Sequence, residues 1–383
     1  MNGAWKNFVL PTSLLTGTII GAGIFSLPYV FHRIGIVASV VYMGVFCIVL
    51  TLVHLMYADI VVASRERHRF AGFARNLLGS RWYIPAIIVG VMQLFLVLTI
   101  YLVLAPSFIR LFLPALGVGW AALAFWVAGT AVIFVSSRRL ALAEFVATLG
   151  IVVTIVLIGV QGIPHALSRP LAAASFDLGS LLLPFGAILY ALIGRTAIPT
   201  LVYYFRDEHG DVKRAKPAIV WGTVIPAALY AVFVIGVLGL SFPPSPDAVS
   251  GLWSVLPAWF MAGVGILGFL ALWSSYFAIG RDLYEALVFD INIVRTVSAC
   301  TVIAVPLLLY WAGLQDFITL VEIVGGIFIG LEGIFIIAMW QKVHVQRSEN
   351  SPILLSSVPL MIRVAMKAVF VVGIFYVLYT QVF

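Results

Sequence analysis

The chain has 383 residues, of which 63% are apolar and 10% are charged, and its formal net charge is +7. A soluble domain of this size needs many more polar side chains to cover its surface, so the composition excludes an ordinary soluble enzyme or binding module. We therefore expect an all-α integral membrane protein. The two cysteines, Cys47 and Cys300, lie in apolar runs. This placement predicts buried free thiols and no disulfide framework.

Windows of about 20 apolar residues, the length of helix that crosses a bilayer, predict eleven spans. Spans one to five cover about residues 8–33, 36–63, 83–113, 118–136 and 140–162. Spans six to eleven cover about residues 178–205, 217–241, 251–279, 293–312, 317–341 and 359–382. The first span is too long for the core of a signal peptide, so we expect it to remain in the membrane.

The basic residues predict the orientation of these spans. With the N-terminus in the cytoplasm, eighteen Lys and Arg residues fall in inner segments, and only Arg33, Arg110 and Arg169 fall in outer loops. Inner loops of membrane proteins carry such an excess of positive charge. We therefore expect a protein of the cell membrane, inner or plasma, with its C-terminus outside. The net charge then needs no nucleic acid to explain it.

The inner connection after span two has the sequence SRERHRFAGFARNLLGS over residues 64–80. It is basic and has apolar residues at helical spacing, which is typical of a helix on a membrane surface. We expect it to anchor the topology there. Recognition of phospholipid headgroups by the same charges is the alternative.

The stretch TIIGAGIFSLP in the first span predicts a broken helix. Gly21 and Gly23 lower helix propensity by about 1 kcal/mol each, and Pro28 removes an amide donor. Unwound backbone at membrane depth is tolerated only where protein or a water-filled cavity supplies hydrogen-bond partners. The stretch is therefore a candidate ligand site.

The sixth span carries a second break of the same form. Gly23 and Pro28 in the first span are five residues apart, as are Gly194 and Pro199 in the sixth, where Gly186 also interrupts the run. The predicted topology sends span one outward and span six inward. Broken helices at matching positions of two five-span halves are typical of transporters built from inverted repeats. Proline kinks without a function are the alternative interpretation.

The two breaks together suit a zwitterion. Amide groups of an unwound segment at Ile20, Gly21, Ala22 and Gly23 would attract a carboxylate, helped by the positive end of the following half-helix. Carbonyl groups near residues 17–20 and 186–190 would accept hydrogen bonds from an ammonium group. We therefore expect an α-amino acid as the ligand. Its side chain would lie among aromatic residues at this depth, for which helix packing is the alternative role: Phe25, Tyr101 and Tyr190.

Arg195 is a cation inside the sixth-span break. A guanidinium near the middle of a bilayer costs a few kcal/mol and must face a cavity or an acceptor. Three roles follow: it pairs with a substrate carboxylate, it replaces a coupling cation, or it locks the break by bonding freed carbonyl groups. A pocket-facing Arg195 would favour an acidic substrate over a neutral, bulky one.

Four acidic residues are candidates for a gate or a proton site. Asp59 lies near the inner end of span two and suits a cap or gate. Asp282 follows span eight with Arg281 and Glu285, as an inner gate network would require. Glu322 and Glu332 flank the Gly325-Gly326 pair in span ten and are the better candidates for carrying a proton.

These segments resemble a known family. TIIGAGIFSLPYVFHRIG is similar to the first helix of the amino acid/polyamine/organocation superfamily, and FGAILYALIGRTAIPTL resembles the sixth helix of its amino acid/auxin permease branch, which includes hydroxy-aromatic amino acid permeases. LWSSYFAIGRDLYEAL in span eight is also similar to that branch. The resemblance implies the leucine-transporter fold and alternating-access transport. Two inverted repeats, 1–165 and 166–345, would precede a peripheral helix in 346–383.

The resemblance also implies a possible cation site. In sodium-coupled members of this fold, helix-eight hydroxyl groups and helix-one carbonyl groups hold the ion, and the matching positions here are Gly17, Ile20, Ser274 and Ser275. Adjacent serines also serve packing and bonding within a membrane helix. Some proton-coupled relatives use a lysine on helix five, but this chain has no lysine between Lys6 and Lys213. Symport with Na⁺ or H⁺ therefore stays open.

Other classes of protein fit less well. The six histidines are scattered without zinc-type spacing, and we expect no enzyme, metal site or cofactor. No repeated charged ring suggests a channel. A sensor that binds an amino acid without transporting it, or a carrier of another small organic cation or metabolite, shares the same predicted site. The expected partners are the amino acid and the lipid bilayer, and the sequence carries no sign of oligomeric state.

Overall fold

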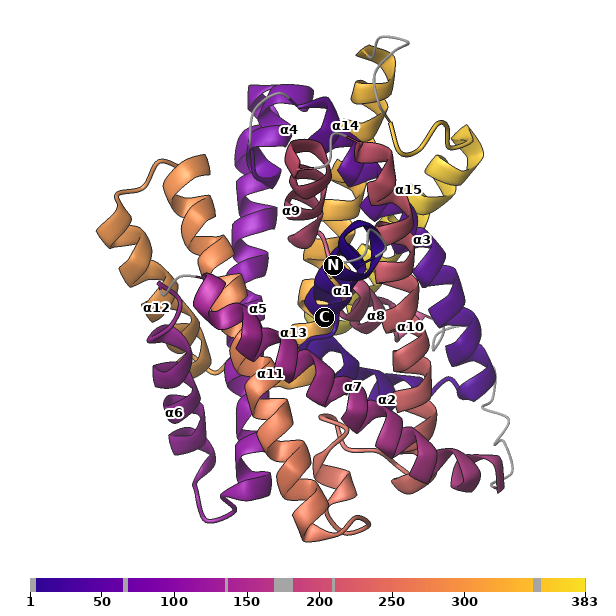
Figure 1. Ribbon diagram of the computed structural model, residues 1–383, viewed down its shortest axis with the longest axis vertical. Coiled ribbons are helices and arrows are strands. Elements are labelled where there is room, and N and C mark those ends of the chain that lie inside the picture. Colours follow the sequence, from indigo (N-terminus) through magenta and orange to yellow (C-terminus); the bar gives the residue numbers. More distant parts are fainter. Residues whose placement is uncertain are drawn as a thin grey trace.

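The computed structural model describes residues 5–64, 68–134, 137–168, 182–208, 211–346 and 353–382 (Figure 1). All regular elements in these ranges are helices. Arg65, Arg67, Arg169 and Arg347, which belong to the charge pattern used above, lie outside the described residues.

The described helices account for the expected spans. Eight are long and apolar enough to cross a membrane, a further span is a bent pair, and two shorter apolar helices complete the set. The unbroken long helices are α3 (Ile36–Ala63), α5 (Tyr83–Phe112), α7 (Ser137–Ser168), α10 (Ala215–Leu240), α11 (Ala258–Glu285) and α15 (Leu360–Val382). The two shorter ones are α6 (Val118–Thr130) and α12 (Arg295–Trp311).

The first, sixth and tenth spans are irregular. In the first, α1 (Leu10–Ile19) is separated from the 3₁₀ turn Ala22–Ser26 and from α2 (Leu27–Phe31), with a bend of 47° across the break. In the sixth, α8 (Phe185–Leu192) and α9 (Ala197–Tyr203) flank four non-helical residues. In the tenth, α13 (Phe317–Glu322) and α14 (Gly330–Gln346) are joined by a π-helical segment, Ile323–Ile329.

Four of the expected span boundaries are wrong by six or seven residues, which is well over a turn. Spans five and eight were expected to end at residues 162 and 279, but α7 ends at Ser168 and α11 at Glu285. Span four was expected to reach residue 136, but α6 ends at Thr130. Span eight was expected to begin at residue 251, but α11 begins at Ala258, after Pro257. A hydrophobicity window cannot separate an apolar loop from a helix, and the segment before Pro257 includes only a short 3₁₀ turn at Ser250–Leu252.

The broken helices lie inside the bundle. Figure 1 places α1, α8 and α13 near its centre, with α6 and α12 at one edge and α3 and α15 toward the other. Helices α7 and α10 pack closely against each other at glycine residues. A Cβ atom added at Gly162 would lie 1.9 Å from the carbonyl oxygen of Gly236, so the two helices meet main chain to main chain. Small residues allow this close approach between membrane helices.

The inner connection after span two is part of the protein core. It forms α4 (Phe70–Leu78), and the side chains of Phe70 and Phe73 are buried. Phe73 packs edge-on against Tyr57, and Phe70 packs edge-on against Phe335. The expectation of a helix resting on the membrane surface is therefore wrong, because the apolar face of α4 is covered by other helices rather than by lipid.

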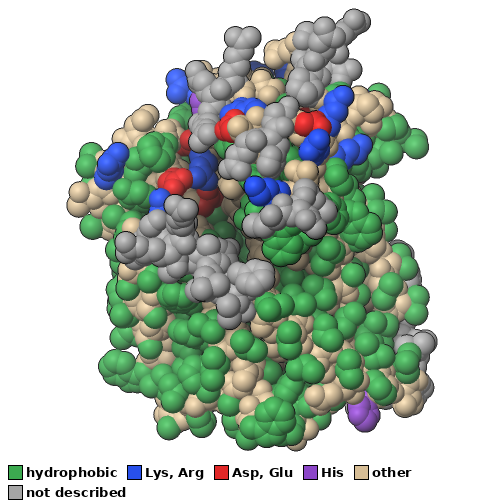
Figure 2. Space-filling view, in the orientation of Figure 1, with side chains coloured by type: hydrophobic (Ala, Val, Ile, Leu, Met, Phe, Trp, Pro, Cys, Tyr) green, Lys and Arg blue, Asp and Glu red, His purple; other side chains and the backbone are tan. Residues whose placement is uncertain are grey.

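Charge is concentrated at one end of the molecule. Figure 2 shows acidic and basic side chains gathered toward the upper end, where α4 and α14 lie, while the lower part of this face is mainly hydrophobic.

The prediction of two buried cysteines is wrong: Cys300 is exposed and Cys47 is half-buried, both as free thiols. Apolar positions on the outside of a membrane protein contact lipid, so an apolar run does not imply burial in protein.

Candidate functional site

The first predicted break is confirmed. The last residue of α1, Ile19, is followed by Ile20 with φ −73° and ψ 88°, and by Gly21 in an extended conformation with φ −134° and ψ −150°. The amide of Ile20 still bonds the carbonyl of Thr16 at 2.9 Å. Helical geometry resumes at Ala22 as a 3₁₀ turn. The main chain is therefore unwound at the first of the two glycines.

The second predicted break is confirmed as well. The helix α8 ends at Leu192, and Ile193 is extended with φ −73° and ψ 130°. The next helix, α9, begins at Ala197 and contains Pro199 in its first turn, where proline has no amide bond to lose. The unwound segment therefore includes Gly194 and Arg195.

The two breaks pack against each other reciprocally. A Cβ atom added at Gly23 would lie 2.4 Å from the Cα atom of Ala191, on the last turn of α8. A Cβ atom added at Gly194 would lie 2.7 Å from side-chain atoms of Leu15 and Ile19, on the last turns of α1. Each glycine thus allows one broken helix to approach the other. These close contacts require glycine for space.

His54, in the middle of α3, holds the second break. The amide of Gly194 donates to His54 Nε2 at 3.0 Å, and His54 Nδ1 lies 3.0 Å from the hydroxyl of Thr223. That hydroxyl donates to the carbonyl of Ile219 at 3.0 Å. Because Nε2 accepts, the proton of a neutral imidazole sits on Nδ1 and is donated to Thr223. A protonated ring has no free nitrogen to accept from the Gly194 amide, so this chain of bonds requires a neutral ring. His54 is fully buried.

Tyr230, in α10, bonds both breaks. Its hydroxyl lies 2.7 Å from the carbonyl oxygen of Ile19 and 3.1 Å from that of Ala191. These carbonyl groups belong to the last turns of the two half-helices and lack ordinary helical partners. The sequence analysis missed both Tyr230 and the capping role of His54. The available signal was a polar side chain in the middle of an apolar span, opposite a predicted break.

A cavity of about 60 Å³ lies between the breaks, and we call it the break cavity. Six of the ten residues predicted to contact the substrate line it: Gly21, Ala22, Gly23, Tyr101, Tyr190 and Arg195. A Cβ atom added at Gly21 would lie 3.1 Å from the Tyr101 hydroxyl, so glycine leaves the main chain open to this phenol. Gln93 and Ile329, from helices three and ten, are among the other residues on its wall, and neither was predicted from the sequence.

The other four predicted residues lie beside the break cavity rather than on its wall. Gly186 packs against helix ten, where an added Cβ atom would lie 2.7 Å from the Cα atom of Glu322. Phe25 packs edge-on against Phe108 at 4.8 Å between ring centres. Ile20 is buried at the end of α1, and Gly194 faces His54.

A larger cavity of about 300 Å³, which we call the vestibule, adjoins the break cavity. The two share the residues Thr18, Tyr101, Thr196 and Ile279. Two of the four residues matched to a cation site, Gly17 and Ser275, line the vestibule. Ser274 is buried and donates to the carbonyl of Ala271 at 3.0 Å within its own helix.

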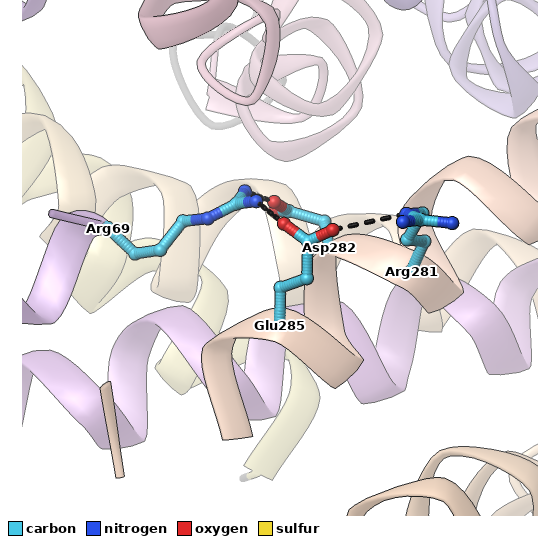
Figure 3. A network of polar contacts seen from close by, with 4 residues as sticks. All are labelled: Arg69, Arg281, Asp282 and Glu285. Carbon is cyan, nitrogen blue, oxygen red and sulfur yellow. Dashed lines mark hydrogen bonds and ion pairs between the residues drawn. The ribbon is translucent and has the colours of Figure 1, made fainter. Parts of the chain in front are cut away.

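Ion pairs line the vestibule at its charged end. Arg69, at the start of α4, pairs with Asp282 and Glu285 of α11, and Arg281 Nε lies 3.1 Å from Glu285 Oε1 (Figure 3). The acidic residues predicted after span eight therefore do form a network. Its partner from another helix is Arg69, which joins the connection after span two to helix eight.

Arg195 is paired with Glu332 of α14. The Nε atom of Arg195 lies 2.6 Å from Oε1 of Glu332, and the two side chains are 7% and 0% exposed. The guanidinium carbon lies 5.1 Å from the ring centre of Phe70 on α4, within the range of a cation–π contact. The cation in the break is thus neutralised by a carboxylate of helix ten.

The remaining two acidic candidates lie away from the break cavity. Asp59 accepts bonds from the indole of Trp340 at 2.9 Å and from the amide of Leu354 at 2.7 Å, so it ties helix two to helix ten and to the segment before α15. Glu322 accepts a bond from the side chain of Gln381 on α15. Both carboxylates have hydrogen-bond partners in these positions.

Comparison with known proteins defines the class. The model of the tryptophan/tyrosine permease family matches residues 5–378, so the chain belongs to this family. It is an amino acid permease and a multi-pass membrane protein, not an enzyme. No curated protein matches the chain.

A solved structure shows the same fold. The chain is similar to the crystal structure of MhsT in complex with L-phenylalanine, with a TM-score of 0.65 and 16% sequence identity over 97% of this chain and 98% of that one. The fold is therefore that of the leucine transporter. At this level of identity the likeness concerns the fold alone.

Proposed function

We propose that the protein is a secondary active transporter that carries a neutral, bulky amino acid by alternating access, coupled to a cation. The observation that carries the proposal is the break cavity, which is lined by unwound main chain and by two tyrosines. Main-chain groups near Gly21 suit the charged ends of a zwitterion. Tyr101 and Tyr190 suit an apolar or aromatic side chain.

Arg195 lines the break cavity, but its pairing with Glu332 supports a neutral substrate over an acidic one. An acidic side chain would need a cation of its own inside the cavity. The only guanidinium on the cavity wall, among the described residues, is already paired with Glu332. The break cavity is smaller than the 300 Å³ or more of ordinary ligand sites. A bulky substrate would therefore need the break cavity to join the vestibule, with which it shares four wall residues.

The vestibule supports an inward-facing state. It carries the Arg69 network, and Arg69 directly precedes α4, which lies at the end of the molecule where charge gathers. By the excess of positive charge in inner loops, this end is cytoplasmic in the cell membrane. On the other side of the first break, Phe25 packs against Phe108 and Phe233. We infer that the substrate path is open to the cytoplasm and closed by these rings toward the outside.

Counterflow in proteoliposomes tests this function. Vesicles loaded with unlabelled tryptophan, tyrosine or phenylalanine should take up the same labelled amino acid, and empty vesicles should not. Repeating uptake in sodium and in choline, each at two pH values, identifies the coupling ion. A rise in melting temperature with the amino acid but no exchange would contradict transport and favour a sensor, since any ligand of the folded state stabilises it.

A further inference from the structure

We propose that Glu332 is the proton-binding residue of this carrier and that Arg195 controls when the proton binds. The inference rests on the proposed function, because it names the coupling ion and the residue that carries it. In this proposal the ion pair between Arg195 and Glu332 separates and forms again in each transport cycle, instead of holding the break in one conformation.

The carboxyl group of Glu332 is stable as an anion only beside Arg195. Its side chain is 0% exposed on α14, and an unpaired carboxylate at such a depth costs several kcal/mol. Besides the guanidinium, the group that bonds it in the described part of the chain is the side chain of Gln93, which carries no charge. Asp59, by comparison, has both oxygens bonded. Glu332 is therefore ionised beside Arg195 and protonated without it.

The groups around the pair provide no replacement for the guanidinium. Gln93 on α5 and Tyr57 on α3 face it and are uncharged. The charged groups within electrostatic range of Arg195 or Tyr57 are Arg69, at the start of α4, and Asp290, at the end of the Ala286–Asp290 turn. Arg69 is already held by Asp282 and Glu285.

Of the two members of the pair, Arg195 lines the break cavity and Glu332 does not. A substrate carboxylate that enters this cavity therefore reaches the guanidinium first. Arg195 also belongs to an unwound segment, which has fewer main-chain bonds to hold it than a helix has. Competition between two carboxylates for one guanidinium follows from this arrangement.

The exchange balances in charge and in protons. Before binding, Arg195 and Glu332 together are neutral. When the guanidinium pairs with the substrate carboxylate, Glu332 takes one proton and becomes neutral, and the loaded site has gained one positive charge. When the substrate leaves, Arg195 returns to Glu332 and the proton is released. Each cycle therefore moves one zwitterion, one proton and one positive charge.

The test separates exchange from accumulation. Proteoliposomes with wild type, Glu332→Gln, Glu332→Asp or Glu322→Gln receive labelled aromatic amino acid under a gradient of one pH unit, acid outside. Valinomycin and equal potassium hold the membrane potential at zero. One proton per substrate gives about tenfold accumulation for wild type. Glu332→Gln should accumulate nothing, yet its counterflow should stay above that of empty vesicles, because Arg195 stays free for the substrate.

The other two variants serve as matched controls. Glu332→Asp keeps a titratable group and should still accumulate substrate. Glu322→Gln makes the same chemical change in the same span, beside Gln381 and away from the break cavity, and should also accumulate it. Accumulation by Glu332→Gln at the wild-type ratio, or its loss in Glu322→Gln alone, would overturn the inference.

A measurement on wild type covers failure of Glu332→Gln to fold. Purified protein in weakly buffered detergent should take up about one proton from solution per substrate bound, and no proton uptake would overturn the inference. Accumulation driven by a sodium gradient alone would overturn it too, while leaving cation-coupled transport intact. Absence of exchange in wild type would instead refute the proposed function.

Discussion

The two breaks differ in how their free main-chain groups are satisfied. In the first, the carbonyl of Ile19 bonds Tyr230, and Gly21 faces the hydroxyl of Tyr101. In the second, the amide of Gly194 is held by His54 and the next residue carries a buried ion pair. The first break therefore presents bare main chain, as a substrate site requires. The second holds the charges, as a coupling site requires.

The side chains that bond the breaks also cross between the two halves of the molecule. His54, from the second span, bonds the break of the sixth. Tyr230, from the seventh span, bonds the carbonyl groups of both. Spans two and seven hold the same position in the two expected repeats, so each repeat supplies a polar side chain to a break in the other. The comparison implies that removal of the buried charge has a larger effect than loss of a close contact or of a hydrogen bond at either break.

Removal of Arg195 should have the largest effect. Arg195→Ala takes the partner from buried Glu332, whose carboxyl group must then take a proton or stay as an unpaired anion. This costs stability, up to about 3–5 kcal/mol for the unpaired anion, and uptake should fall to background. Uptake in proteoliposomes and thermal unfolding in detergent measure the two losses. The double variant Arg195→Ala/Glu332→Ala should recover stability but not uptake. Uptake by Arg195→Ala at the wild-type rate would contradict any role of this residue in the site.

The effects of alanine at Gly23 and at Gly194 should differ according to the atoms that the added methyl group contacts. At Gly23 the added methyl group meets main chain of Ala191, which cannot yield without shifting α8, so we expect a loss of about 1–3 kcal/mol and of most uptake. At Gly194 it meets the flexible ends of Leu15 and Ile19, and the effect should be smaller. Gly44→Ala, with nothing within 4 Å, is the control. Equal effects at all three positions would contradict the claim that Gly23 and Gly194 are needed because the broken helices approach each other closely.

His54 should act as a positioning residue. His54→Leu leaves the amide of Gly194 buried and unpaired, which costs about 1–3 kcal/mol and should raise KM. His54→Gln offers an amide oxygen in place of Nε2 and should restore most of both. Melting temperatures and the KM of uptake distinguish the two variants. Equal melting temperatures and KM values for the two variants would show that the hydrogen bond from Gly194 to residue 54 does not contribute to stability or transport.

Tyr230→Phe should have the smallest effect. It removes one hydroxyl that two carbonyl oxygens share, and a neutral bond of this kind contributes about 0.5–1.5 kcal/mol. We expect a modest fall in melting temperature and a small rise in KM. Tyr379→Phe, on the exposed side of α15, is the matched control and should change neither. A loss as large as that of Arg195→Ala would contradict the larger effect expected for the buried charge.

The two breaks could be predicted from the sequence, but their partners could not. Glycine and proline act on local main chain, so Gly21, Gly23 and Gly194 could be read without knowledge of neighbouring helices. Arg195 was recognised as a cation that needs a partner, but its partner Glu332 lies 137 residues later in the chain. The connection after span two was misplaced for the same reason. An amphipathic helix does not reveal whether lipid or protein covers its apolar face.

By itself, the sequence determined the membrane class, the number of spans, the two interruptions and the residues able to line a site. These follow from hydrophobic length, charge and backbone propensity, which are local properties. Only the tertiary structure decided that Arg195 meets Glu332, that His54 and Tyr230 bond the breaks, and that Gly186 packs against helix ten. Those pairings depend on which helices become neighbours, and packing in three dimensions determines that choice.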